Sequence, residues 1–79
     1  MDPKQIGSMI RYHRKKSGLS QEGLGNLAGL GKTVVFDAEK GKLTIQLSTL
    51  LKLFKVLNIT LHFQSPLMKS FKENLNEKG

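Results

Sequence analysis

Apolar side chains recur at helical spacing near the start of the chain. The positions three or four residues apart are Ile6, Met9, Ile10 and His13. This spacing predicts an amphipathic helix. Asp2 precedes Pro3, and Gln5 follows the aspartate by three positions, which is the pattern of a capped helix start with a proline in its first turn. Gly18 can adopt the left-handed conformation that ends such a helix.

Two shorter helices are predicted next, joined by a turn that contains glycine. Ser20 is the N-cap of the first, although Gly23 and Gly25 each lower its helix propensity by about 1 kcal/mol relative to alanine. The second helix spans residues 32–40 and ends at Gly41. The side chains that we expect to face the core from these two helices are Leu24, Leu27, Ala28, Val35 and Ala38.

A wide apolar stripe predicts a fourth helix over residues 47–57. Its members are Leu47, Leu50, Leu51, Leu53, Phe54, Val56 and Leu57. A stripe of this width indicates burial on two sides. After this helix, Ile59, Leu61 and Phe63 alternate with polar residues, which predicts a half-buried strand over residues 59–64. A lone strand in a helical domain has no partner within its own chain.

The pattern is weaker beyond Pro66. The apolar residues that can line one face of a short helix there are Leu67, Met68, Phe71 and Leu75. Polar residues dominate the rest, and an isolated helix of this length is marginal in water. We therefore expect one folded domain over residues 1–65, followed over residues 66–79 by a flexible tail or a segment that binds a partner.

The composition adds charge and excludes several classes of protein. Thirteen Lys and Arg against six Asp and Glu give a net charge of +7, which attracts polyanions such as nucleic acid or acidic membranes. Seventy-nine residues make one domain with a thin core, which a second subunit would help to stabilise.

Without cysteine there are no disulfides or thiolate metal sites, and the two isolated histidines make no metal cluster. No apolar run is long enough for a signal peptide or a membrane span, so we expect a cytoplasmic protein without metal, cofactor or membrane partner.

The predicted order of helices indicates DNA binding. Two short helices joined by a glycine-containing turn, with a basic helix before them and an apolar helix after them, form a helix-turn-helix framework. Lys32 and Thr33 stand at the start of the third helix, where hydrogen-bonding groups meet base edges in the major groove. Gln21, at the start of the second helix, can reach a phosphate or a base. The same order also fits a small helical bundle that binds no DNA.

Three segments resemble the Xre/Cro-type helix-turn-helix regulators. They are Leu19-Ser20-Gln21-Glu22, Leu27-Ala28-Gly29 and Glu39-Lys40-Gly41, and the resemblance covers roughly residues 5 to 59. It implies an all-α, lambda-repressor-like DNA-binding domain of four to five helices that binds a palindromic operator in double-stranded DNA. It also implies an ion pair between Arg14 and Glu39. The residues expected to contact DNA are Gln21, Lys32, Thr33, Phe36, Asp37, Arg11, Lys40 and Lys42.

The expected DNA contacts differ in kind. Arg11 and Lys42 flank the third helix and are expected to contact mainly phosphate. Asp37 is an unusual residue on the DNA-facing side, where it can accept a hydrogen bond from cytosine or simply repel phosphate. Phe36 either touches a thymine methyl group or packs against a neighbouring side chain.

The stretch from Leu47 through Phe63 is most similar to HipB-type antitoxins, in which the fourth helix runs directly into a strand. The resemblance implies that this strand pairs with its copy across the two-fold axis of a homodimer. The residues expected at the dimer interface are Leu53, Val56, Ile59, Leu61 and Phe63. It further implies a repressor that autoregulates a toxin-antitoxin operon and binds a HipA-like kinase toxin. The alternative is a stand-alone repressor of phage or restriction-modification type.

Two signals for enzymatic chemistry fail. Gly31-Lys32-Thr33 resembles the end of a phosphate-binding loop, but the first glycine of that motif would fall on Asn26. His13 lies on an apolar helix face, and the sequence places no group to orient it. It therefore fits a core or boundary histidine better than a catalytic base. We therefore expect no enzymatic activity. RNA binding is disfavoured because no exposed aromatic residues alternate with the basic ones.

Overall fold

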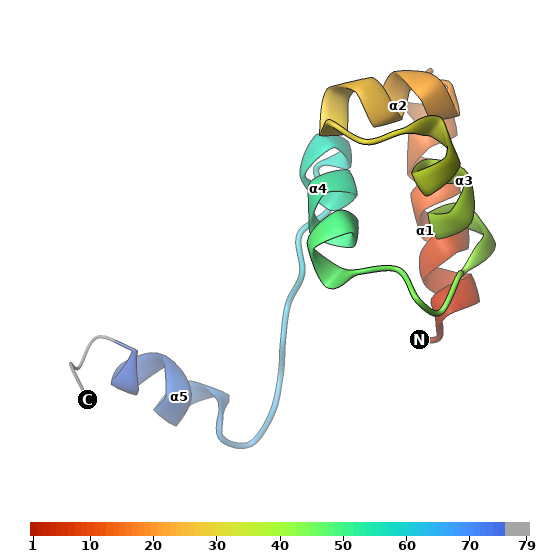
Figure 1. Ribbon diagram of the computed structural model, residues 1–79. Helices are drawn as coiled ribbons and strands as arrows, with labels where there is room; N and C mark the ends of the chain where they lie inside the picture. Colours follow the sequence, from red (N-terminus) through yellow and green to blue (C-terminus); the bar gives the residue numbers. More distant parts are fainter. Residues whose placement is uncertain (76–79) are drawn as a thin grey trace.

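Five helices account for the regular structure of residues 1–75, the part of the chain that the computed structural model describes. They are α1 (Pro3–Lys16), α2 (Gln21–Ala28), α3 (Lys32–Lys40), α4 (Leu47–Leu57) and α5 (Met68–Asn74). Helices α1 to α4 pack into one body, and α5 lies apart from it at the end of an extended linker (Figure 1). The prediction of an all-α domain is confirmed. None of the helices within these residues is long and apolar enough to cross a membrane.

Capping groups set the bounds of the first two helices. Asp2 accepts a hydrogen bond from the backbone N–H of Gln5, and the Gln5 side chain accepts one from the backbone N–H of Asp2, both at 2.8 Å. This capping box confirms the predicted start of α1. Ser20 Oγ accepts from the backbone N–H of Gly23 at 2.9 Å and caps α2. Helix α2 ends at Gly29, whose φ of 71° lies in the left-handed region that favours glycine.

The core lies where the first four helices meet. Each helix contributes one side chain with no exposed surface, and these are Ile10, Leu24, Val35 and Leu53. Helix α3 packs on α1 and α2, and α4 packs on the same two helices. Because α3 faces the core through Val35 and Ala38, its opposite face remains available to a ligand.

Two close contacts between segments require glycine. A Cβ atom at Gly7 of α1 would lie 2.5 Å from the carbonyl oxygen of Glu39, and one at Gly25 of α2 would lie 2.6 Å from that of Leu30. Both neighbours are backbone atoms, which cannot rotate away. The sequence indicated only that Gly25 weakens α2. Its close approach to the turn before α3 is the reason why a side chain does not fit there.

Two leucines lie differently from the sequence prediction. Leu27, expected in the buried stripe of α2, is 64% exposed, because α2 turns the side that carries Leu24 and Gly25 toward the body. Leu53, expected at the dimer interface, is fully buried in the core of the single chain. Its side chain therefore has no surface to offer a second protomer, and we assign it to the core.

The predicted strand over residues 59–64 is absent from the single chain. Residues 59–65 form neither helix nor strand, and no strand occurs elsewhere in residues 1–75 to pair with them. Leu61 and Phe63 are accordingly 40% and 69% exposed. The extended linker raises the radius of gyration to 15.0 Å, above the ~12 Å expected of a compact chain of this length.

Candidate DNA-binding surface

Helix α3 carries a set of exposed side chains on the face turned away from the core. The exposed residues are Lys32, Thr33, Phe36 and Lys40. Val35 and Ala38 anchor the opposite face against the body. Lys32 and Thr33 form the first turn of α3, so the structure leaves both residues that we expect to read bases open at the N-terminus of the helix.

Two lysines contact neighbours on or beside α3. Lys42 Nζ donates a hydrogen bond to Asp37 Oδ2 at 3.3 Å, and this cation offsets the charge that would otherwise repel phosphate. Lys40 Nζ lies 5.5 Å from the centroid of the Phe36 ring, within the range of a cation–π interaction. Phe36 thus packs against a neighbour and still remains 46% exposed. The structure brings all four side chains to the exposed flank of the motif.

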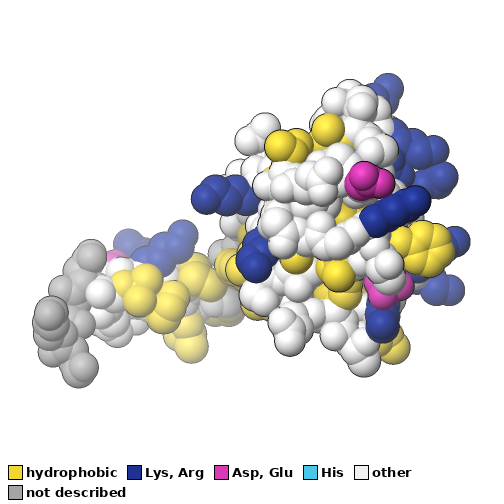
Figure 2. All heavy atoms as spheres, turned by 45° about the horizontal axis from the view of Figure 1, so that its top comes forward, with side chains coloured by type: hydrophobic (Ala, Val, Ile, Leu, Met, Phe, Trp, Pro, Cys, Tyr) yellow, Lys and Arg dark blue, Asp and Glu magenta, His cyan; other side chains and the backbone are white. Residues whose placement is uncertain are grey.

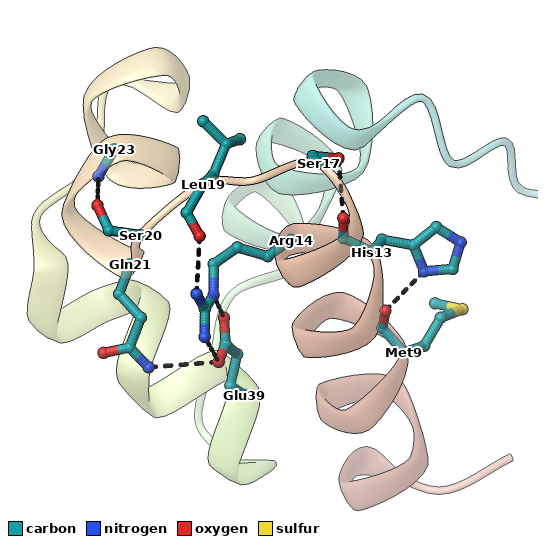
Figure 3. Close-up of polar contacts among 9 residues, drawn as sticks. All are labelled: Met9, His13, Arg14, Ser17, Leu19, Ser20, Gln21, Gly23 and Glu39. Carbon is teal, nitrogen blue, oxygen red and sulfur yellow. Dashed lines mark hydrogen bonds and ion pairs between the residues drawn. The ribbon is translucent and has the colours of Figure 1, made fainter.

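Arg14 and Glu39 join the end of α1 to the end of α3. Arg14 Nη2 donates to Glu39 Oε1 at 3.0 Å, and Arg14 Nε donates to Oε2 of the same carboxylate (Figure 3). The two side chains are only 10% and 4% exposed. Arg14 Nη1 also donates to the backbone carbonyl of Leu19 at 2.9 Å, so a single guanidinium connects α1, the turn before α2, and α3. The hydrogen bond with Glu39 raises the pKa of Arg14 above its ordinary value, against the opposing effect of burial, and the charge of Glu39 adds to the rise.

Gln21, the first residue of α2, reaches the same carboxylate. Its Nε2 donates to Glu39 Oε1 at 3.3 Å, and this oxygen also accepts from Arg14 Nη2 (Figure 3). Sequence reasoning placed Gln21 beside DNA but missed this bond. The two residues are 18 positions apart, and only the packing of α2 on α3 brings them together, so no local pattern signals the contact.

A hollow of about 300 Å³ lies between α1, the start of α2 and α3. Its lining residues are Ser8, Arg11, Gln21, Phe36, Glu39 and Lys40. Arg11 therefore comes close to the exposed face of α3 although it belongs to α1. Figure 2 shows many of the Lys and Arg side chains of the four-helix body along its right-hand side, where they create a positive flank. Among residues 1–75, no group of three or more His, Asp or Glu side chains is placed to hold a metal ion.

The remaining residues expected at a dimer interface lie at the end of α4 and in the linker. Val56 and Ile59 are half-buried and pack against the core. Leu61 and Phe63 are more exposed. Helix α4 also exposes Leu51 by 45%, a residue that the wide apolar stripe contained but that sequence reasoning did not assign to an interface.

Comparison with known proteins agrees with this geometry. The family model described as Helix-turn-helix matches residues 10–64, which contain α2, α3 and α4 in full. The chain belongs to the helix-turn-helix family. It is 33% identical over 64 residues to the uncharacterized HTH-type transcriptional regulator y4mF of Sinorhizobium fredii, a match that covers 81% of this chain and 84% of the relative. It is 39% identical over 59 residues to the control protein C.SmaI of Serratia marcescens, with 73% and 70% covered.

Membership of the family of helix-turn-helix transcriptional regulators gives the elements their roles. Helices α2 and α3 correspond to the two helices of the helix-turn-helix motif, in which the second is the recognition helix. The matched segment ends before α5, so α5 lies outside the part shared with the family.

Proposed function

We propose that this regulator is a repressor that binds a palindromic operator in double-stranded DNA sequence-specifically, as a homodimer. The observation that carries the proposal is the exposure of Lys32 and Thr33 at the start of α3, beside a flank of basic side chains. Arg11, from α1, and Lys42, just after the end of α3, supply phosphate contacts beside the recognition helix. A footprint of the purified chain on the DNA upstream of its own gene tests the proposal. Protection of a site with two-fold symmetry is the expected result.

Replacing Lys32 by alanine is expected to cost about 1–3 kcal/mol of binding free energy on the cognate operator and to relax sequence preference. Arg11→Ala is the matched control, because Arg11 is also an exposed cation and contacts phosphate in this proposal. It should weaken cognate and random duplexes by the same factor. Binding titrations on both duplexes at one salt concentration measure the difference. Equal losses on the two duplexes for Lys32→Ala would show that Lys32 reads no base.

The homodimer is proposed to form through the apolar flank of α4 and the linker that follows it. Leu51, Leu61 and Phe63 are exposed there, and a shallow apolar depression of about 310 Å³ lies at the base of the linker. Residues 59–64 keep the period-two pattern of a strand, and no strand within residues 1–75 pairs with them. Antiparallel pairing with the same residues of a second copy would satisfy their backbone groups and cover these side chains.

Leu61→Lys is expected to yield monomers whose operator affinity falls at least tenfold, because two-fold symmetry brings two buried charges into one apolar interface. The helical circular dichroism should remain, since Leu61 lies outside the core. Leu67→Lys is the control, because Leu67 is 74% exposed and lies beyond the proposed strand. Sedimentation measures the oligomeric state of both variants. A dimeric Leu61→Lys variant, or a monomeric wild type at micromolar concentration, contradicts this interface.

An autoregulating HipB-like antitoxin role is a second proposal, and one observation favours it. Helix α5 lies apart from the body, and Phe71 in it and Leu75 just after it are 55% and 64% exposed, which is a surface that a HipA-like kinase toxin could cover. A stand-alone repressor of phage or restriction-modification type needs no such partner, and the similarity to a relative named as a control protein favours it. An adjacent reading frame for a HipA-like kinase supports the first role, and an adjacent phage or restriction gene supports the second.

A further inference from the structure

The side chain of Gln21 is held from within the protein. Its Nε2 donates to Glu39 Oε1 at 3.3 Å. An ionised carboxylate only accepts hydrogen bonds, so it can hold only the NH₂ side of the amide. The carbonyl oxygen of Gln21 therefore points away from Glu39, as Figure 3 shows.

Glu39 is itself fixed in place. Arg14 contacts both of its carboxylate oxygens, and Arg14 is held in turn by the backbone carbonyl of Leu19. With Glu39 only 4% exposed at its side chain, the carboxylate has little room to move. The buried Arg14 thus holds Glu39, and Glu39 in turn holds the half-buried Gln21.

Gln21 also lies in the middle of the residues expected to meet DNA. It lines the hollow that contains Arg11, Phe36 and Lys40. It lines as well a second groove, which leads along the start of α2 to Lys32. A side chain between these two depressions faces whatever binds to the exposed side of α3.

We propose that Glu39 is a positioning residue for DNA binding, which orients the Gln21 amide toward the DNA. An amide that donates one N–H to Glu39 keeps its second N–H and its carbonyl oxygen for phosphate or base contacts. Because the side chain is already ordered, less rotamer entropy is lost when DNA binds. The Arg14–Glu39 pair then has a second role besides joining α1 to α3. This inference rests on the proposed function.

A set of three variants of the full chain separates positioning from folding. They are Gln21→Ala, the double variant Arg14→Met/Glu39→Met, and the triple variant that combines all three changes. The double variant removes both buried charges together, so it should keep the fold while releasing Gln21. The probe is a duplex that the wild-type chain selects from a randomised pool. If the wild-type chain selects no duplex, the proposed function is contradicted. The anchoring of Gln21 by Glu39 is then tested by the NMR measurement described below.

The expected result is non-additive loss. Gln21→Ala and the folded double variant should each weaken binding about tenfold, and the triple variant should be no weaker than either. If the Arg14–Glu39 pair served the fold alone, a double variant that folds would bind DNA as the wild type does, and the losses would multiply in the triple variant. A double variant that keeps its melting temperature and binds as tightly as the wild type would overturn the proposal, and so would multiplied losses in the triple variant.

A measurement on the wild-type chain without DNA tests the anchoring directly. The side-chain amide of Gln21 should show a clearly higher NMR order parameter than that of the exposed Gln64, which should fall in the flexible range below about 0.6. Gln64 is a matched control because it carries the same amide outside the four-helix body. A Gln21 amide as mobile as that of Gln64 would also overturn the proposal.

Discussion

Replacing Arg14 by methionine is expected to lower the free energy of unfolding by about 3–5 kcal/mol. Methionine fills much of the same space but leaves the Glu39 carboxylate, which is 4% exposed at its side chain, without its cation. The carbonyl of Leu19 also loses a donor. A chain of 79 residues has a total stability of only about 4–12 kcal/mol, so this single change removes a large share of it.

The double variant Arg14→Met/Glu39→Met should recover most of that loss. It leaves no uncompensated buried charge, and buried ion pairs contribute little net stability relative to apolar replacements of similar volume. Urea denaturation of the two single variants and the double variant completes a double-mutant cycle. A strongly favourable coupling free energy between the two positions is expected.

Lys42→Met is the control for the effect of burial. Lys42 and Asp37 form the second ion pair beside α3, and their side chains are 55% and 31% exposed. Solvent screens this pair, so its loss should change the free energy of unfolding by less than about 1 kcal/mol. If Arg14→Met costs no more than Lys42→Met, the buried pair does not hold α1 to α3.

Gly7→Ala is expected to destabilise the protein by about 3 kcal/mol, although alanine has the higher helix propensity by about 1 kcal/mol. The added Cβ would lie 2.5 Å from the carbonyl oxygen of Glu39 and 2.6 Å from that of Ala38. Relief of this overlap requires α1 and the end of α3 to separate. The melting temperature should fall by more than about 12 °C in a domain of this size.

Gly23→Ala is the matched control, since it places the same methyl group inside a helix without a backbone neighbour. Its Cβ would lie 3.1 Å from Ser20 Oγ, which is a side-chain atom that can shift. The stability should stay within about 1 kcal/mol of the wild type. Equal melting temperatures for Gly7→Ala and Gly23→Ala would mean that α1 and α3 lie farther apart than the structure has them.

Features that depend on neighbouring residues could be predicted from the sequence. The capping box of Asp2 and Gln5 forms within one helical turn, and Gly41 ends α3 where the local pattern stops. The apolar spacing likewise predicted α1 and α4 as amphipathic helices. Predictions of burial were less accurate, because burial depends on which other helix packs against the side chain. Leu27 belongs to the apolar pattern of α2, but its side of the helix is turned away from the core and it is 64% exposed.

By itself, the sequence determined the order and ends of the helices, the positive charge and the residue types at the start of α3. Capping and periodicity act between neighbouring residues, and the net charge is the sum of the charged side chains. Only the tertiary structure decided that Leu53 belongs to the core, that Gly7 and Gly25 leave room for backbone, and that Glu39 holds Gln21. Each of these depends on which faces of separate helices meet, and on distances that residues far apart in the chain acquire when the helices pack. The unpaired linker after α4 has the same cause, since strand pairing needs a second segment that residues 1–75 do not contain.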